Sequence, residues 1–181
     1  MSHFSVLVVT EKKPDEKLLH KLFAPYEENG ENEKQKWDWY QVGGRWTGHL
    51  SDYDPEKDPS NMVACKFCKG TGMRNDEVGI EARSENPSYT CNSCDGKGEH
   101  LKWPTNWVPC DQDSIQVKDL SKNIEPTFAI LKDGEWLERG EMGWFAMVSN
   151  KKDKDEWQKQ FNETLKALPK NNWLTIVDCH I

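Results

Sequence analysis

Two short arms rich in cysteine and glycine constrain this chain more than any other feature. Residues 65–72 read CKFCKGTG and residues 91–98 read CNSCDGKG, so both follow the pattern C-x-x-C-x-G-x-G. Thiolates separated by two residues can bind one metal ion from a tight turn, and two such turns supply the four sulfurs of a closed tetrahedral zinc site. The glycines permit the close-approach backbone that a chain wrapped around a bound sulfur needs. The spacing therefore predicts one Zn²⁺ per chain, held by Cys65, Cys68, Cys91 and Cys94.

Two disulfides are the alternative use of these cysteines, and they require an oxidising compartment. Residues 1–4 (MSHF) contain no basic region and residues 11–13 (EKK) are charged, which is unlike a secretory signal. No apolar run approaches the about 20 residues that a membrane-spanning helix requires. We therefore expect a cytoplasmic protein without membrane association, in which the thiols bind metal.

The two arms resemble the cysteine-rich zinc repeats of DnaJ-type chaperones at each cysteine and each glycine. That family carries four such arms and two zinc ions, whereas this chain has two arms and lacks the His-Pro-Asp tripeptide of the J-domain. The resemblance covers residues 65–98. It implies a zinc hairpin rather than a co-chaperone.

Three further segments resemble uncharacterised proteins of bacteria and their phages. They are residues 37–46 (WDWYQVGGRW), residues 143–145 (GWF) and residues 178–181 (DCHI). This second resemblance implies a bacterial cell or a phage-infected host as the setting, and it brings no activity with it.

The segments on either side of the arms predict strands and helices. Residues 4–9 (FSVLVV) are a short apolar run typical of a buried strand. Apolar residues recur at helical spacing in residues 14–26 and 153–168, which predicts two amphipathic helices. The other predicted elements are a hairpin of residues 37–42 and 45–50, a hairpin of residues 127–131 and 135–139, and strands at residues 144–148 and 173–178.

This order of elements predicts an α+β fold. We expect a ferredoxin-like antiparallel sheet with two helices on one face, formed by residues 1–60 and 111–181. Residues 61–110 would be an inserted zinc-binding hairpin module that interrupts this main domain.

The charge of the chain argues against nucleic acid as a partner. The 181 residues carry a formal net charge of -7, whereas nucleic-acid-binding domains usually present a basic face. Within residues 61–110 the basic and acidic residues balance, and no basic cluster accompanies the tryptophans. A protein partner is therefore expected, and the sequence sets no oligomeric state.

Trp103 and Trp107 follow the second arm and have two interpretations. Large aromatic side chains most often pack inside a protein, here between the module and the main domain. Exposed beside a metal turn, they would instead form a partner surface.

The turn at Gly43-Gly44 is a candidate binding site. Paired glycines usually make a simple turn. They also let backbone amides approach an anion, with Arg45 as the counter-charge and Trp46 as contact area.

The other candidate residues are His49, Asp178 and His180. Asp178 and His180 would lie on one face of the last strand and Cys179 on the other, so Cys179 and His180 should not form an activated thiolate pair. A second metal bound by His49, Asp178 and His180 is an alternative. No phosphate loop or nucleophile elbow is present, so we assign no catalytic residue.

These observations favour a zinc-stabilised binding protein that contacts another macromolecule, which we expect to be a protein. A phage-encoded inhibitor or modulator of a host machine would fit the second resemblance. The alternative is a small enzyme or ligand-binding protein with a site near Arg45, His49, Asp178 and His180.

Overall fold

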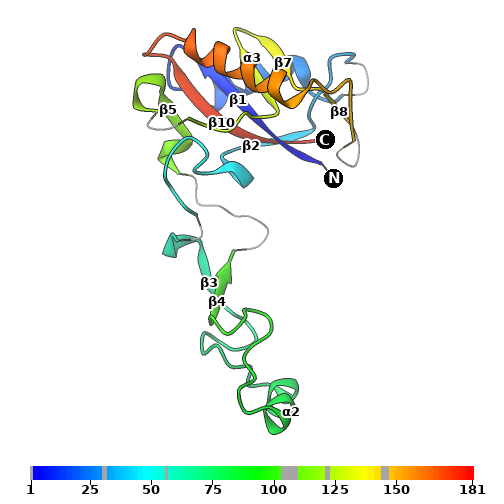
Figure 1. Ribbon diagram of the computed structural model, residues 1–181, viewed down its shortest axis with the longest axis vertical. Helices are drawn as coiled ribbons and strands as arrows, with labels where there is room; N and C mark the ends of the chain where they lie inside the picture. The colour runs from blue at the N-terminus through cyan, green and yellow to red at the C-terminus, as the bar shows by residue number, and fades with distance from the viewer. Residues whose placement is uncertain (1, 30–31, 56, 103–109, 121–122, 144–146) are drawn as a thin grey trace. The chain divides into compact units, whose positions relative to one another are not determined.

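The computed structural model describes residues 2–29, 32–55, 57–102, 110–120, 123–143 and 147–181. The chain divides into two compact units (Figure 1). We call Met1–Tyr53 together with Pro109–Ile181 the sheet unit, and Asp54–Val108 the cysteine module. None of the described helices has the length and apolar character needed to cross a membrane.

The sheet unit contains a six-stranded sheet. Five strands follow the order β2 (Trp39–Val42), β10 (Trp173–His180), β1 (His3–Thr10), β6 (Ala129–Lys132) and β7 (Glu135–Glu138), while β5 (Ser114–Gln116) also pairs with β10. β1 is antiparallel to β10 but parallel to β6, so the sheet is mixed. A small separate ladder joins β8 (Glu141–Met142) to β9 (Val148–Ser149).

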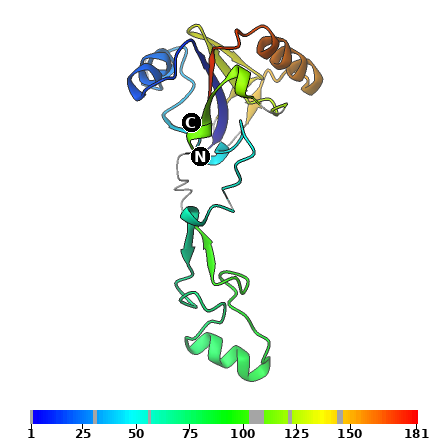
Figure 2. The ribbon, with the colours of Figure 1, turned by 90° about the vertical axis from the view of Figure 1, so that its left-hand side faces the viewer.

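Two helices cover the sheet from opposite faces, as Figure 2 shows. α1 (Glu16–Phe23) packs through Phe23 onto the face that carries Val6. α3 (Lys154–Lys166) packs through Phe161 onto the face that carries Leu7. Successive strand residues point to opposite faces, so the continuous apolar run of β1 supplies both cores.

The predicted α+β class is confirmed, but the predicted antiparallel sheet with both helices on one face is wrong. β2 hydrogen-bonds to β10, so α1 connects β1 to a parallel strand on one side of it. The segment from β7 to β10, which contains β8, β9 and α3, also joins two parallel strands of the sheet. Given the strand directions, two right-handed crossovers of this kind place their helices on opposite faces of the sheet.

The predicted hairpin at Gly43-Gly44 is also wrong. β2 ends at Val42, and a 3₁₀ turn over Gly44–Trp46 follows instead of a returning strand. Further tight turns lead to Leu50. Most of the strand predicted at residues 144–148 lies outside the described residues.

The cysteine module holds a two-stranded ladder and a helix. β3 (Met62–Ala64) pairs antiparallel with β4 (Glu99–Leu101), which brings the start of the first arm next to the end of the second. α2 (Glu77–Glu85), which the sequence analysis did not predict, lies in the spacer between the arms. The buried cluster of this unit consists of the four arm cysteines.

Candidate metal centre

The four arm cysteines form a compact, buried tetrad. Their sulfurs all lie within 4.8 Å of one another, and the Sγ atoms of Cys65 and Cys91, like those of Cys68 and Cys94, are 3.7 Å apart. Four sulfurs bound to one Zn²⁺ at about 2.3 Å in a tetrahedron would be about 3.8 Å apart. The donor set therefore fits one metal ion and leaves no coordination position open for a substrate.

The two arms are joined by reciprocal backbone contacts. The N–H of Cys65 donates to the Gly98 carbonyl, and the N–H of Cys91 donates to the Gly72 carbonyl, both at 2.8 Å. Gly72 has φ +73°, and a Cβ there would lie 2.3 Å from the Gly96 carbonyl oxygen. Backbone therefore packs on backbone around the tetrad, which explains why the repeated motif contains glycines as well as cysteines.

Hydrogen bonding and burial shift the pKa values of two of these thiols in opposite directions. The backbone N–H of Cys68 lowers the pKa of the Cys65 thiol to about 6, whereas burial raises the pKa of the Cys94 thiol to about 11. Metal ligation requires thiolates. A bound metal cation would favour the thiolate form of both residues.

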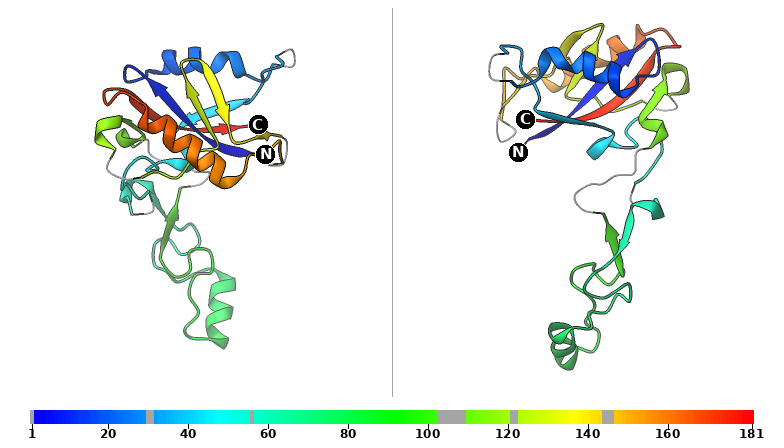
Figure 3. Two further views of the ribbon diagram at one scale, coloured as in Figure 1. Left: turned by 45° about the horizontal axis from the view of Figure 1, so that its top comes forward. Right: turned by 180° about the vertical axis from the view of Figure 1, so that it is seen from behind.

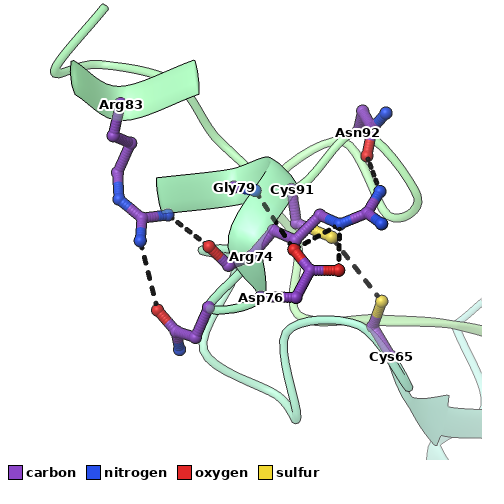
Figure 4. A network of polar contacts seen from close by, with 8 residues as sticks. Cys65, Arg74, Asp76, Gly79, Arg83, Cys91 and Asn92 are labelled. Atoms are coloured by element: carbon purple, nitrogen blue, oxygen red, sulfur yellow. Dashed lines mark hydrogen bonds and ion pairs between the residues drawn. The ribbon is translucent and has the colours of Figure 1, made fainter. Parts of the chain in front are cut away.

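An arginine network links the arms to α2 (Figure 4). Nε of Arg74 donates to both carboxylate oxygens of Asp76 at 2.7 Å, and Nη1 donates to Oδ1 of Asn92 at 3.2 Å. Asp76 also caps α2 by accepting from the N–H of Gly79, and its contact with Arg74 lowers its pKa. The Arg74 guanidinium lies 4.6 Å from the ring centroid of Phe67. Arg74 thus connects both arms and the start of α2.

Large apolar side chains are exposed on this module. They are Phe67, Met73, Val78 and Ile80, with Ile80 58% exposed. In the described part of the sheet unit the corresponding residues are Trp39 and Met147. The module is the smaller unit, so the exposed apolar groups are concentrated on it.

Gly43 and Gly44 each lie against a buried carboxylate of the chain itself. A Cβ on Gly44 would be 2.6 Å from Oδ2 of Asp178, and a Cβ on Gly43 would be 2.2 Å from Oδ2 of Asp113. The N–H of Arg45 donates to Asp178 at 3.0 Å. The groups that meet this turn are therefore side chains of the chain itself, and binding of an external anion here stays a prediction.

Asp113 is fully buried and organises the rest of this turn. It accepts hydrogen bonds from the Thr47 hydroxyl at 2.6 Å and from the Gly48 N–H at 2.8 Å. Burial raises the pKa of this carboxyl group. The N–H of Gly48 bonds to Asp113, and those of Trp46 and Thr47 donate within the turn, so these amides are not available to pair with a returning strand.

Asp178 and His180 lie in a polar cluster at one end of the sheet. Nδ1 of His3 is 2.8 Å from Oδ1 of Asp178, and Nδ1 of His180 is 2.6 Å from Oδ1 of Asp38. We call these four residues the sheet-end cluster. Strand alternation separates Cys179 from them, since Cys179 is buried on the α1 face, where burial raises its thiol pKa.

The remaining predicted site residues lie elsewhere. Nε2 of His49 is 2.9 Å from the Glu125 carbonyl oxygen, and no metal-binding group of His49, Asp178 and His180 forms among the described residues. Trp46 packs against the core under α3, while the Arg45 side chain is exposed. Trp103 and Trp107 lie outside the described residues.

Sequence reasoning missed His3, Asp38 and Asp113. His3 lies just before the predicted strand of residues 4–9 and begins the observed β1. Its partners depend on the pairing of β1 with β10, in which His3 lies opposite His180. No protein-family model, curated protein or solved structure matches this chain, so the geometry of its own residues carries the functional argument.

Proposed function

We propose that this chain is a binding protein that contacts another protein through its cysteine module. The observation that carries this proposal is the concentration of exposed apolar side chains on a unit whose buried cluster is a tetrad of cysteines. Exposed apolar groups gathered on a small unit are typical of interaction surfaces. A metal would supply the rigidity that the missing apolar core does not.

Zn²⁺ is the metal that we propose for the tetrad. Four thiolates in a tetrahedral arrangement are typical of structural zinc, and such sites contribute folding energy directly. The residues that would hold the ion are the four arm cysteines. A saturated four-sulfur site has a structural role, so binding rather than catalysis would be the work of this unit.

The charge of the module favours a protein over a nucleic acid. Basic and acidic residues balance in residues 61–110, and phosphate backbones are usually bound by clustered lysine and arginine. The apolar side chains would instead occupy complementary apolar pockets of a partner. Following the resemblance to bacterial and phage proteins, the proposed partner belongs to a bacterial host machine that this chain inhibits or modulates.

Affinity capture from the native host, followed by quantitative binding of the purified partner, tests this function. Phe67→Ser and Ile80→Ser should each weaken binding by about fivefold or more, because each removes an exposed apolar contact of about 1–3 kcal/mol. Met147→Ser removes an exposed apolar side chain from the sheet unit and is the matched control. Equal affinity of all three variants and the parent would contradict the proposal.

A further inference from the structure

One end of the α3 face of the sheet changes from apolar to polar along two neighbouring strands. On β10 the apolar residue Ile176 is followed on the same face by Asp178 and His180. On β1 the corresponding positions toward the strand start are Ser5 and His3, with His3 directly opposite His180. Asp178 is 2% exposed, so its carboxyl group is built into the sheet, whereas the Asp38 side chain of the same cluster is exposed.

Each histidine of the sheet-end cluster is oriented by a carboxylate. A carboxylate only accepts hydrogen bonds, so Nδ1 of His3 and Nδ1 of His180 both carry the hydrogen in these contacts. In the neutral ring Nε2 then holds the lone pair. A histidine that donates one ring N–H to a carboxylate while presenting the other nitrogen is the recurring arrangement of metal-ligating histidines.

Nε2 of His180 is a buried acceptor without a hydrogen-bond partner in the described structure. Leaving a buried polar atom without a partner destabilises the folded state. The Asp38 contact holds the ring in place on its Nδ1 side, so rotation cannot relieve this cost without breaking that contact. A ligand at Nε2 would remove the penalty.

The two rings lie edge to face, at a centroid separation that two ligands of one ion would also have. Their centroids are 5.0 Å apart, with an interplanar angle of 70°. A nitrogen bound to Zn²⁺ at about 2.0–2.1 Å puts its ring centroid about 3.2 Å from the ion, and two such rings at a tetrahedral angle are about 5 Å apart.

The charge of the cluster also fits a cation. Asp38 and Asp178 contribute two carboxylates, and their ion-pair partners among the described residues are the two histidines. With both rings neutral the cluster carries two negative charges. A divalent ion would balance them.

We propose that His3 and His180 bind a divalent transition-metal ion through their Nε2 atoms, with Asp178 and Asp38 as positioning residues. Imidazole nitrogens suit Zn²⁺ and Ni²⁺. Two protein ligands do not saturate such an ion, which sets this site apart from the four-sulfur tetrad. The site lies in the sheet unit and does not depend on the proposed function of the module.

The test is calorimetric titration of the full chain, with zinc already in its tetrad, using Zn²⁺ and separately Ni²⁺. The parent should bind one further equivalent of each ion. His3→Asn and His180→Asn keep a donor near the Nδ1 position but remove Nε2, so each should weaken this second binding at least tenfold. His20→Asn, which changes an exposed histidine of α1, should bind as the parent does.

Nuclear magnetic resonance of the parent provides a readout that does not depend on variants. Paramagnetic Ni²⁺ should broaden the ring signals of His3 and His180 first and leave those of His20 sharp. Binding of only one metal equivalent per chain, parent-like affinity in both Asn variants, or broadening that spares His3 and His180 would each overturn the proposal.

Discussion

Gly43 and Gly44 lie together in one turn because two buried carboxylates approach it. Both glycines have positive φ, and neither has room for a Cβ. Asp113 follows them by about 70 positions and Asp178 by more than 130. The local pattern of two glycines therefore predicts a turn, but the side chains that leave room only for glycine, Asp113 and Asp178, come from distant parts of the chain.

Replacing Gly44 by alanine should destabilise the sheet unit. The Cβ would lie 2.5 Å from Cβ of Asp178 at φ +53°, so left-handed strain and a steric clash act together and cost about 2–4 kcal/mol. Gly134→Ala is the matched control, because Gly134 has φ +80° but open space around it, and strain alone should cost about 1–2 kcal/mol. Urea denaturation of both variants measures the difference. Equal losses would show that the contact with Asp178 is unimportant.

Asp113 should make stability depend on pH. Burial raises its pKa in the folded state above its value in the unfolded chain, near 3.9. Between these two pKa values the folded state keeps a proton that the unfolded state has released, so raising the pH through this window lowers the free energy of unfolding.

Comparison with Asp113→Asn isolates this effect, since the variant cannot titrate at this position. The stability advantage of the parent over the variant should be largest below about pH 4 and shrink as the pH rises through the folded-state pKa. Urea unfolding of both proteins from about pH 3.5 to 7 gives the difference. An advantage that grows with pH would show that the carboxylate form is the one the fold prefers.

At the scale of elements, α2 depends on the arms rather than on an apolar face. It spans nine residues, its buried residue is Gly79, and Val78 and Ile80 are exposed. A helix this short is marginal by itself. The Asp76 cap and the contacts of Arg74 and Arg83 with the preceding turn hold it in place.

Arg74→Ala should therefore loosen the cysteine module. The change removes the link between the start of α2, Asn92 of the second arm and the Phe67 ring. We expect several-fold faster release of zinc to a chromogenic chelator. Lys66→Ala removes an equal charge from an exposed position next to Cys65 and is the control. Identical release from both variants would show that the tetrad alone holds the arms.

At the scale of the whole molecule, the two units are stabilised differently. The sheet unit has an apolar core on each face of its sheet, and its first and last strands pair along their full length, with the two ends of the chain side by side (Figure 3). The buried cluster of the cysteine module is its four thiols. Metal removal should therefore affect one unit and spare the other.

Chelation should unfold residues 65–98 while β1, β10 and α3 stay folded. Zinc provides most of the folding energy of small metal-bound units, and the apolar cores of the sheet unit contain no arm cysteine. Hydrogen exchange before and after treatment with a chelator measures this directly. A uniform increase in exchange along the chain would contradict the separation of the two units.

The sequence by itself determined the features that depend on neighbouring residues. The spacing of the arms determined the tetrad, since two-residue gaps and positive-φ glycines act within a single turn. Apolar spacing predicted α1, α3 and the buried strands β1 and β10. A continuous stripe of apolar side chains must be buried, whichever element of the fold covers it.

Only the tertiary structure decided which of these elements meet. The position of β2 beside β10 placed the two helices on opposite faces of the sheet. No local sequence pattern predicts which edge of the sheet β2 joins. The register of β1 against β10 placed His3 opposite His180, and the turn at Gly43 gathered Asp113 and Asp178. Strand pairing and buried-carboxylate contacts join residues about 65 or more positions apart. Their partners are selected by the packing of the whole sheet, so the cysteine tetrad could be predicted from the chain and the sheet-end cluster could not.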